Sequence, residues 1–260
     1  MCGEIVLYKI DIQDVDHIFN ALSESRKLHI MKLFGAPFMR TARPLFMLEE
    51  LELKYELIPI NPRVGAAKNT KDYAEYMSGV NPYGKVPTLV DDDFVLNESA
   101  VIVNYLCDQY GKGNYIPKAG SKERAKYDAL CYTLVIEIDA QSLYMHRKHI
   151  GLKHIYGEAP TAVDAAKTYF EKQFPIYTKV LESNQYMFGD SITGLDILCT
   201  HTFLWAKSLG WYKDDLSYVN NYLGRMCARD SFKRAYEKHV PNTYTSGMEY
   251  VERYNSSNKL

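Results

Sequence analysis

Residues 81–99 read NPYGKVPTLVDDDFVLNES, and this stretch decides the fold of the chain. Its first four residues have turn chemistry and lead into a Val-Pro pair. Two short apolar runs follow, at 88–90 and 94–96, and the acidic residues between them suit the tight turn of a β-hairpin. The second run then gives way to the apolar periodicity of an amphipathic helix. The stretch therefore predicts a turn, a hairpin and a helix in close succession.

Glu98 and Ser99 stand where the second strand ends and the helix begins. A helix N-terminus favours anions, because its first N–H groups lack intrahelical partners and the helix dipole is positive there. A cis bond before Pro87, at the entrance to a strand, would expose the Val86 backbone for pairing with an extended ligand. These residues suggest a site for a small peptide with a free carboxylate and amine. By themselves they favour the simpler interpretation, a plain hairpin followed by a capped helix.

The order N-P-x-G-K-V-P-x-L, a hairpin, and then E-S-x-x-I-x-x-Y-L resembles the glutathione-binding half of the glutathione S-transferase family. The match runs over residues 81–106 without an internal gap and extends more weakly over residues 29–240. The similarity is to the serine-type, theta- and phi-like bacterial branch. The resemblance implies an α/β thioredoxin-like N-terminal domain, an all-helical C-terminal domain, a homodimer and a role in detoxification.

The composition fits a folded protein of one large or two modest domains. The chain has 260 residues, of which 47% are hydrophobic, which is ample for a buried core and excludes a disordered chain. The net charge is −1, with 31 basic and 32 acidic residues, so electrostatics favours neither nucleic acid nor an anionic membrane. We therefore expect no nucleic-acid or membrane partner.

The cysteines indicate a reducing compartment. There are five of them, widely spaced and without a Cys-x-x-Cys pair, which argues against a disulfide framework and a zinc site. The sequence also lacks a run of ~20 apolar residues that would span a bilayer. Acidic residues near the N-terminus interrupt any signal-peptide core. We expect a cytoplasmic protein without a bound metal.

Composition shifts and the resemblance divide the chain into five parts. Glycine and proline concentrate between the two family-like regions, which marks a linker there. The parts are an N-terminal extension at 1–28, a thioredoxin-like glutathione-binding domain at 29–111, a linker at 112–120, an all-helical domain at 121–247 and a C-terminal tail at 248–260.

In the first domain the pattern predicts a β-α-β-α-β-β-α order. Apolar runs at 28–34 and 54–60 read as strands, and 44–51 between them reads as the helix of a parallel crossover. Residues 61–80 are expected to form a loop with a short helical turn.

Helical periodicity dominates after the linker. Residues 121–149 predict one long bent helix or two, and 161–181 predict another helix that Pro175 kinks or breaks. Thr193 and Asp196 have the spacing of a capping box, and in the family resemblance this acidic residue is structural.

The segment that should activate a thiol departs from the family pattern. Lowering the pKa of a thiol from ~8.5 by about two units requires about 2.7 kcal/mol of thiolate stabilisation, which a hydroxyl donor and a helix N-terminus can supply. Members of the family place a serine, tyrosine or cysteine after the first strand. Here Phe34 stands where tyrosine is expected, and Phe38 or Met39 stands where serine is expected. The candidate catalytic residues are therefore Thr41, which also has the sequence context of a helix N-cap, and Arg40, whose charge would attract a thiolate.

The resemblance also implies how glutathione would be held. The Val86 backbone would pair with the cysteinyl moiety beside a cis Pro87, while Glu98 and Ser99 would hold the γ-glutamyl amine and carboxylate. A basic side chain, Lys85 or Lys71, would bind the glycyl carboxylate. Glutathione is expected as a co-substrate, without a further cofactor.

The pocket for the second substrate is expected between the domains. Its candidate lining residues are Tyr132, Tyr144, Met145 and Trp205. The run at 146–149, His-Arg-Lys-His, lacks an acidic third ligand, so we interpret it as a solvated helix end in preference to a metal site.

Three functions follow from these features. The first is conjugation of glutathione to small apolar electrophiles by thiolate attack. The second is a non-catalytic protein of the same fold that binds a ligand or a partner, which the residues at 38–39 favour and the intact glutathione motif opposes. The third is a glutathione-dependent dehalogenase or lyase. A reductase is disfavoured, because residues 36–41 contain no nucleophilic cysteine.

Overall fold

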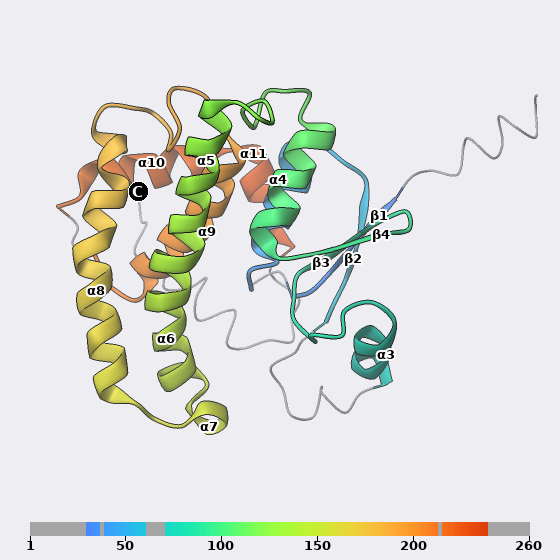
Figure 1. The fold of residues 1–260 in the computed structure, drawn as a ribbon, viewed down its shortest axis with the longest axis horizontal. Helices are drawn as coiled ribbons and strands as arrows, with labels where there is room; N and C mark the ends of the chain where they lie inside the picture. The colour runs from blue at the N-terminus through green and yellow to red at the C-terminus, as the bar shows by residue number, and fades with distance from the viewer. Residues whose placement is uncertain (1–29, 37–38, 61–70, 213–214, 239–260) are drawn as a thin grey trace, which may run out of the picture.

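The structure is a computed structural model that describes residues 30–36, 39–60, 71–212 and 215–238 (Figure 1). Within these residues a small β-sheet with its helices lies beside a larger helical body (Figure 1). The predicted N-terminal extension at 1–28 and the tail at 248–260 lie outside the described residues.

The sheet has four strands in the order β2-β1-β3-β4. β1 (Met31–Phe34) pairs in parallel with β2 (Tyr55–Ile58) and antiparallel with β3 (Thr88–Asp91), and β3 forms the predicted hairpin with β4 (Phe94–Asn97). A parallel pair needs a crossover helix, whereas a two-residue turn suffices for the hairpin. This mixed sheet confirms the thioredoxin-like fold predicted for the first half of the chain.

Three helices belong to the sheet: α2 (Ala42–Glu50), α3 (Lys71–Gly79) and α4 (Ser99–Tyr110). α2 is the crossover between β1 and β2, and its residues 42–49 are all buried. It contacts α4 on the sheet side and both α9 and α11 of the helical body. A helix that is buried on every side belongs to the core of the whole molecule.

The second half of the described chain is helical. Its elements are α5 (Lys122–Thr133), η2 (Leu134–Leu143), α6 (Tyr144–His146), η3 (Arg147–Gly151), α7 (Lys153–Tyr156), α8 (Pro160–Thr178), η4 (Lys179–Glu182), α9 (Gly194–Ser208), α10 (Ser217–Ala228) and α11 (Asp230–Glu237). Pro175 lies inside α8 and does not break it, because the helix continues to Thr178 and passes into the 3₁₀ turn η4.

The predicted long helix over 121–149 is one continuous helical path that changes its winding. α5 is α-helical, whereas η2 and η3 are π-helical. π-Helices are rare, mostly single-turn and frequent at functional sites, so a ten-residue π segment is an unusual feature. It includes Asp139 and ends immediately before Tyr144.

α9 begins at the predicted capping box. The Asp196 carboxylate is fully buried and accepts from the backbone N–H groups of Thr193 and Met187, each at 2.8 Å, and from the Tyr222 hydroxyl at 3.1 Å. Burial raises the pKa of Asp196, while these hydrogen bonds oppose the rise. Asp196 therefore has the predicted structural role.

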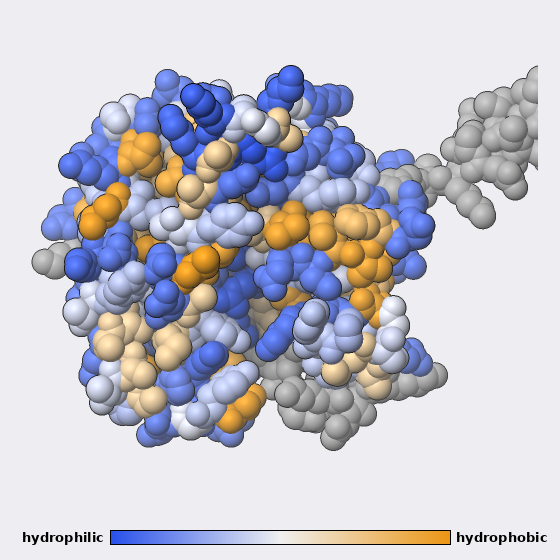
Figure 2. Space-filling model, in the orientation of Figure 1, coloured by the Kyte–Doolittle hydropathy of each residue, from blue (hydrophilic) through white to orange (hydrophobic). Residues whose placement is uncertain are grey.

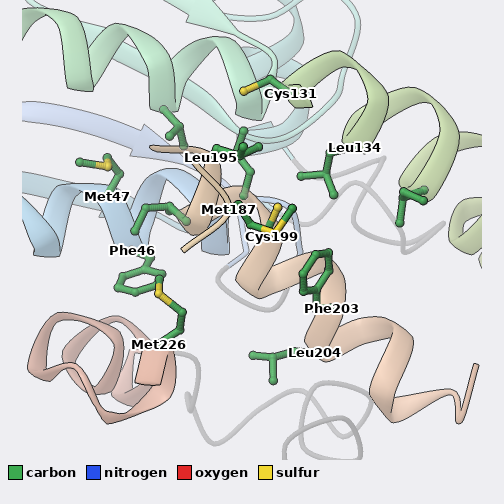
Figure 3. Packing of buried hydrophobic residues seen from close by; sticks show 14 of the residues in the cluster. Phe46, Met47, Cys131, Leu134, Met187, Leu195, Cys199, Phe203, Leu204 and Met226 are labelled. Atoms are coloured by element: carbon green, nitrogen blue, oxygen red, sulfur yellow. The ribbon is translucent and has the colours of Figure 1, made fainter. Parts of the chain in front are cut away.

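One large hydrophobic cluster joins the sheet to the helical body. Figure 3 shows its middle, where Leu195, Cys199 and Phe203 of α9 pack with Phe46 and Met47 of α2. Because α2 supplies side chains to this shared core, any residue at its N-terminus has a fixed position relative to both halves. In the described part of the chain, no helix combines the length and apolar character required to cross a lipid bilayer.

Candidate functional site

A cavity of about 350 Å³ lies where the α2 N-terminus faces the start of β3 and the start of α4. The residues that line it are Arg40, Asn81, Tyr83, Lys85, Val86, Pro87, Asn97, Glu98 and Ser99. Its size falls within the roughly 300–1,000 Å³ of small-molecule sites. The predicted glutathione contacts Lys85, Val86, Pro87, Glu98 and Ser99 thus share one cavity.

We call the side of this cavity formed by residues 81–87 and 97–99 the sheet wall. The Val86–Pro87 peptide bond is cis, as predicted. The Asn81 side-chain amide donates to the Lys85 carbonyl and to the Thr88 hydroxyl, each at 3.0 Å. The Tyr73 hydroxyl donates to the Gly84 carbonyl at 3.0 Å. These bonds fix the loop that presents the Val86 backbone to the cavity.

Glu98 has a backbone conformation with positive φ, which few non-glycine residues adopt. Its φ is 70° and its ψ is 114°, and it occupies the N-cap position of α4. A non-glycine residue with such angles costs about 1–3 kcal/mol, and such residues cluster at ligand sites. The carboxylate is exposed and lines the cavity beside the first N–H groups of α4.

We call the opposite side, formed by Arg40 with its partners Asp139 and Arg43, the helix wall. Arg40 forms a bidentate ion pair with Asp139, in which Nε donates to Oδ2 at 3.0 Å. Arg43 donates to the same Oδ2 at 2.5 Å and also to the hydroxyls of Ser99 at 3.0 Å and Thr202 at 2.8 Å. A single buried carboxylate therefore holds the cation that faces the cavity and the cation that positions Ser99.

The charge balance of the helix wall is set by Asp139. Burial by itself would raise the pKa of this carboxyl, but the adjacent charges of Arg40 and Arg43 outweigh it and hold the pKa well below its usual value. Asp139 is therefore ionised at neutral pH and neutralises one of the two guanidinium charges. Arg40 keeps 24% of its side-chain surface exposed, at the cavity, whereas Arg43 is buried.

The structure separates the two candidate catalytic residues. Arg40 lines the cavity, whereas Thr41 is completely buried and is absent from the described lining. Thr41 occupies the N-cap position of α2, but its hydroxyl makes no capping hydrogen bond. It packs on Gly35, where a Cβ atom would come within 2.2 Å of the hydroxyl oxygen, so glycine is required there.

Tyr144 and Trp205, two of the four residues predicted for the second-substrate pocket, lie at Arg40. The Arg40 guanidinium carbon lies 4.6 Å from the Tyr144 ring centre and 5.9 Å from that of Trp205. Met145 packs against the hydrophobic core instead. Tyr132 is 63% exposed and lies on α5, before the ten-residue π segment that leads to Tyr144, so the structure does not bring it into this group.

The interpretation of residues 146–149 as a solvated helix end is wrong. All four are partly buried. The His146 ring packs at 5.5 Å against Trp211, and the His149 Nδ1 atom lies 2.9 Å from the Gly157 carbonyl oxygen. Arg147 and Lys148 lie beside the Tyr144 ring. Among the described residues, no group of three or more His, Cys, Asp or Glu side chains gathers as a metal ion requires.

Lys85 is exposed at the rim of the cavity, and Lys71 begins α3, with its side chain outside what the structure describes. Sequence reasoning missed Asp139 and Asn97. Asp139 had no distinctive signal, since residues 134–143 also contain Glu137, Gln141 and Ser142, and nothing in the sequence indicated its partners. Asn97 lines the cavity and accepts from the Thr88 hydroxyl at 2.7 Å.

Comparisons with known proteins agree with this geometry. Residues 30–108 match the family model of the glutathione S-transferase N-terminal domain. The chain is 30% identical over 217 residues to glutathione S-transferase hmp2 of Hypomyces subiculosus, covering 79% of this chain and 97% of that protein. It is 29% identical over 234 residues to glutathione S-transferase 1 of Triticum aestivum, covering 85% of this chain and 99% of that protein.

The fold is also that of solved glutathione transferases. URE2P8 of Phanerochaete chrysosporium, determined with oxidized glutathione, superposes with a TM-score of 0.69 at 21% identity, covering 82% of this chain and 96% of that one. The fold and the cavity define the chain as a thioredoxin-like protein with an added helical domain. With the relatives above, this shows that the chain belongs to the glutathione S-transferase family.

Proposed function

We propose that this protein conjugates glutathione to small apolar electrophiles, by attack of the glutathione thiolate in the cavity between the sheet wall and the helix wall. One observation carries the proposal: Val86, Glu98, Ser99 and the cation Arg40 line the same cavity. The sheet wall supplies the contacts that a tripeptide needs, and the helix wall supplies the charge that its thiol needs.

In the proposed binding mode the tripeptide runs along the sheet wall. The Val86 backbone pairs with the cysteinyl residue as an added strand would. The Glu98 carboxylate binds the γ-glutamyl amine, and the α4 N-terminus with Ser99 binds the γ-glutamyl carboxylate. Lys85 or Lys71 binds the glycyl carboxylate. URE2P8, a structural neighbour, binds oxidized glutathione, which supports this assignment.

In the proposed mechanism Arg40 stabilises the thiolate. It is the cation that the described cavity lining places at the α2 N-terminus, whose dipole also favours negative charge. Asp139 holds the guanidinium in place through two hydrogen bonds. Thr41 contributes packing on Gly35, since its hydroxyl is buried away from the cavity.

We also propose that the protein acts as a cytoplasmic homodimer in detoxification, without a further cofactor. The dimer is supported by apolar side chains that are exposed on β4 and α4: Phe94, Val95 and Val101. Exposed apolar residues that gather on neighbouring elements are typical of protein interfaces. Sedimentation equilibrium of the wild type and of a Phe94→Glu variant tests this, and a wild-type monomer would contradict it.

Calorimetric titration with glutathione tests the binding half of the proposal. We expect saturable binding with one site per chain, and no detectable heat at millimolar glutathione would overturn the proposal. Conjugation to a neutral chloronitrobenzene then tests the chemistry. Binding without any rate above the uncatalysed reaction would favour the non-catalytic alternative. Halide release from a haloalkane without accumulation of a glutathione conjugate would favour the dehalogenase.

A further inference from the structure

The helix wall continues beyond Arg40 into a group of cations around one tyrosine ring. The Arg40 guanidinium lies 4.6 Å from the Tyr144 ring centre, the Lys148 ammonium lies 5.1 Å from it, and the Arg147 guanidinium lies 5.6 Å from it. Lys148 also lies 5.9 Å from the Tyr156 ring centre. We call Tyr144, Arg147, Lys148 and Tyr156 the cationic cluster.

The charges of the cationic cluster are not neutralised within the described residues. Asp139 is committed to Arg40 and Arg43. Neither Arg147 nor Lys148 forms an ion pair with any described side chain, although both are partly buried. Burial and then the charge of Arg40 lower the pKa of Arg147, so these cations repel one another without a ligand. Partly buried like charges without counterions lower the stability of the folded protein, and a bound anion would remove this penalty.

The cationic cluster adjoins the proposed thiolate site through Arg40. Arg40 belongs both to the glutathione cavity and to the set of cations around Tyr144, so the cluster is continuous with the proposed thiolate site. Tyr144 and Tyr156 supply aromatic surface, and Trp205 lies 5.9 Å from Arg40. Figure 2 shows the molecular surface hollowed between the helical body and the half that carries the sheet.

We propose that the cationic cluster is the acceptor subsite and selects electrophiles that carry a carboxylate on a flat apolar ring. This rests on the proposed function and adds a preference to it: among electrophiles built on a flat apolar ring, those that also carry a carboxylate react faster. Arg147 and Lys148 bind the carboxylate, and the Tyr144 ring packs on the apolar part of the substrate. A neutral acceptor leaves the two charges without a partner and gains only the packing.

The test uses two chloroarenes that differ in charge. One is a chloronitrobenzoate and the other is the chloronitrobenzamide with the same substitution pattern, chlorine ortho to the nitro group. In both reactions the thiolate sulfur bonds to the ring carbon, chloride leaves with the electrons of the C–Cl bond, and the thiol proton passes to solvent. Each kcat/KM at saturating glutathione is divided by the uncatalysed rate constant with free glutathione, which removes the difference in intrinsic reactivity.

We expect the normalised rate to be about tenfold higher for the carboxylate, the size of one favourable charge interaction near a protein surface. The double variant Arg147→Gln with Lys148→Gln should bring the two normalised rates together, and its circular-dichroism spectrum and melting temperature, compared with those of the wild type, show that it folds. Lys172→Gln, an exposed charge on α8, is the matched control and should keep the preference. Added salt should weaken the preference in the wild type.

Two results would overturn the acceptor subsite while leaving the proposed function intact. One is an equal normalised rate for the two probes in the wild type. The other is a double variant that keeps the carboxylate preference. If the enzyme conjugates neither probe, and no neutral chloronitrobenzene either, the proposed transferase function itself fails, and the acceptor subsite fails with it.

Discussion

The sheet wall and the helix wall of the cavity are held together by different kinds of contact. In the sheet wall, hydrogen bonds join residues close in sequence, such as Asn81 to Lys85 and to Thr88. In the helix wall, Arg40 and Asp139 are 99 positions apart, and their ion pair joins the sheet half to the helical body. The sheet wall is therefore suited to shape a ligand site locally, whereas the helix wall couples that site to the stability of the whole molecule.

The largest effect is expected from Asp139→Asn. It removes the carboxylate from Arg43, which is completely buried, and leaves that charge without its counterion. Breaking such a pair costs about 3–5 kcal/mol of unfolding free energy. Asp108→Asn is the matched control, because the Asp108–Arg124 pair lies at the surface and its loss costs about 0–1 kcal/mol. Urea denaturation measures both, and equal losses would show that the helix wall is not a stabilising junction.

Arg40→Gln should have the next largest effect, and on rate more than on binding. If the guanidinium stabilises the thiolate by about 2.7 kcal/mol, its loss lowers the conjugation rate about a hundredfold. Arg40→Lys keeps the charge but loses the bidentate pair with Asp139, so it should recover part of the rate. Steady-state kinetics with glutathione and a neutral chloronitrobenzene measures this. If the conjugation rate of Arg40→Gln equals that of the wild type, Arg40 does not stabilise the thiolate and the helix wall takes no part in the reaction.

The stability that Asp139 supplies should depend on pH in one direction. Its pKa in the folded state lies below the ~3.9 of an unfolded chain, so the folded protein binds the proton less readily. The contribution is complete above about pH 4 and is lost as the pH falls through the folded pKa, at about 1.4 kcal/mol per unit of pKa difference. The stability gap between the wild type and Asp139→Asn should therefore narrow on acidification. If this difference in unfolding free energy stays constant until the protein unfolds in acid, the ion pair of Asp139 does not contribute to stability.

Glu98→Gln tests the sheet wall alone. It keeps the size of the side chain and removes the charge that would bind the γ-glutamyl amine, so glutathione affinity should fall about tenfold. Because Glu98 is exposed, the unfolding free energy should change by less than about 0.5 kcal/mol. Calorimetric titration measures the affinity, with Glu171→Gln on α8 as the control at an exposed helical position. If Glu98→Gln and Glu171→Gln bind glutathione with equal affinity, Glu98 does not contact the γ-glutamyl amine.

Thr41→Val should have the smallest effect. The Thr41 hydroxyl is buried and has no hydrogen-bond partner among the described side chains, so replacing it by a methyl group of similar size removes no bond. Both the unfolding free energy and the conjugation rate per folded molecule should stay within about 0.5 kcal/mol of the wild type. If Thr41→Val loses conjugation rate while its unfolding free energy is unchanged, Thr41 acts on the thiol.

The two walls also differ in what the sequence could predict. The turn, the hairpin and the start of α4 lie within residues 81–99, so their chemistry is local. The cis bond and the shared position of Val86, Pro87, Glu98 and Ser99 at the cavity could be predicted from it, although Asn97 was missed. The capping box of α9 was equally local. The partners of Arg40 and Arg43 could not be predicted, because only the packing of α2 against the helical body brings Asp139 to them.

The same reason explains the incorrect interpretations in the helical half. Helical periodicity predicted a helix over 121–149 but not its change to π winding, which depends on tertiary contacts. Residues 146–149 were read as a solvated end, since a basic run shows nothing of the aromatic rings that partly cover it. Arg40, in the segment that departs from the family pattern, is also where the structure adds a partly buried ion pair.

The pKa of the bound glutathione thiol tests most directly the claim that the sheet wall binds and the helix wall activates. It is measured from the thiolate absorbance of the complex across pH, in the wild type and in Arg40→Gln. We predict a bound pKa one to two units below the ~8.5 of a free thiol. In Arg40→Gln it should return to about 8.5 while glutathione still binds. A wild-type complex that titrates like free glutathione, or a lowered pKa that survives in Arg40→Gln, would contradict the account.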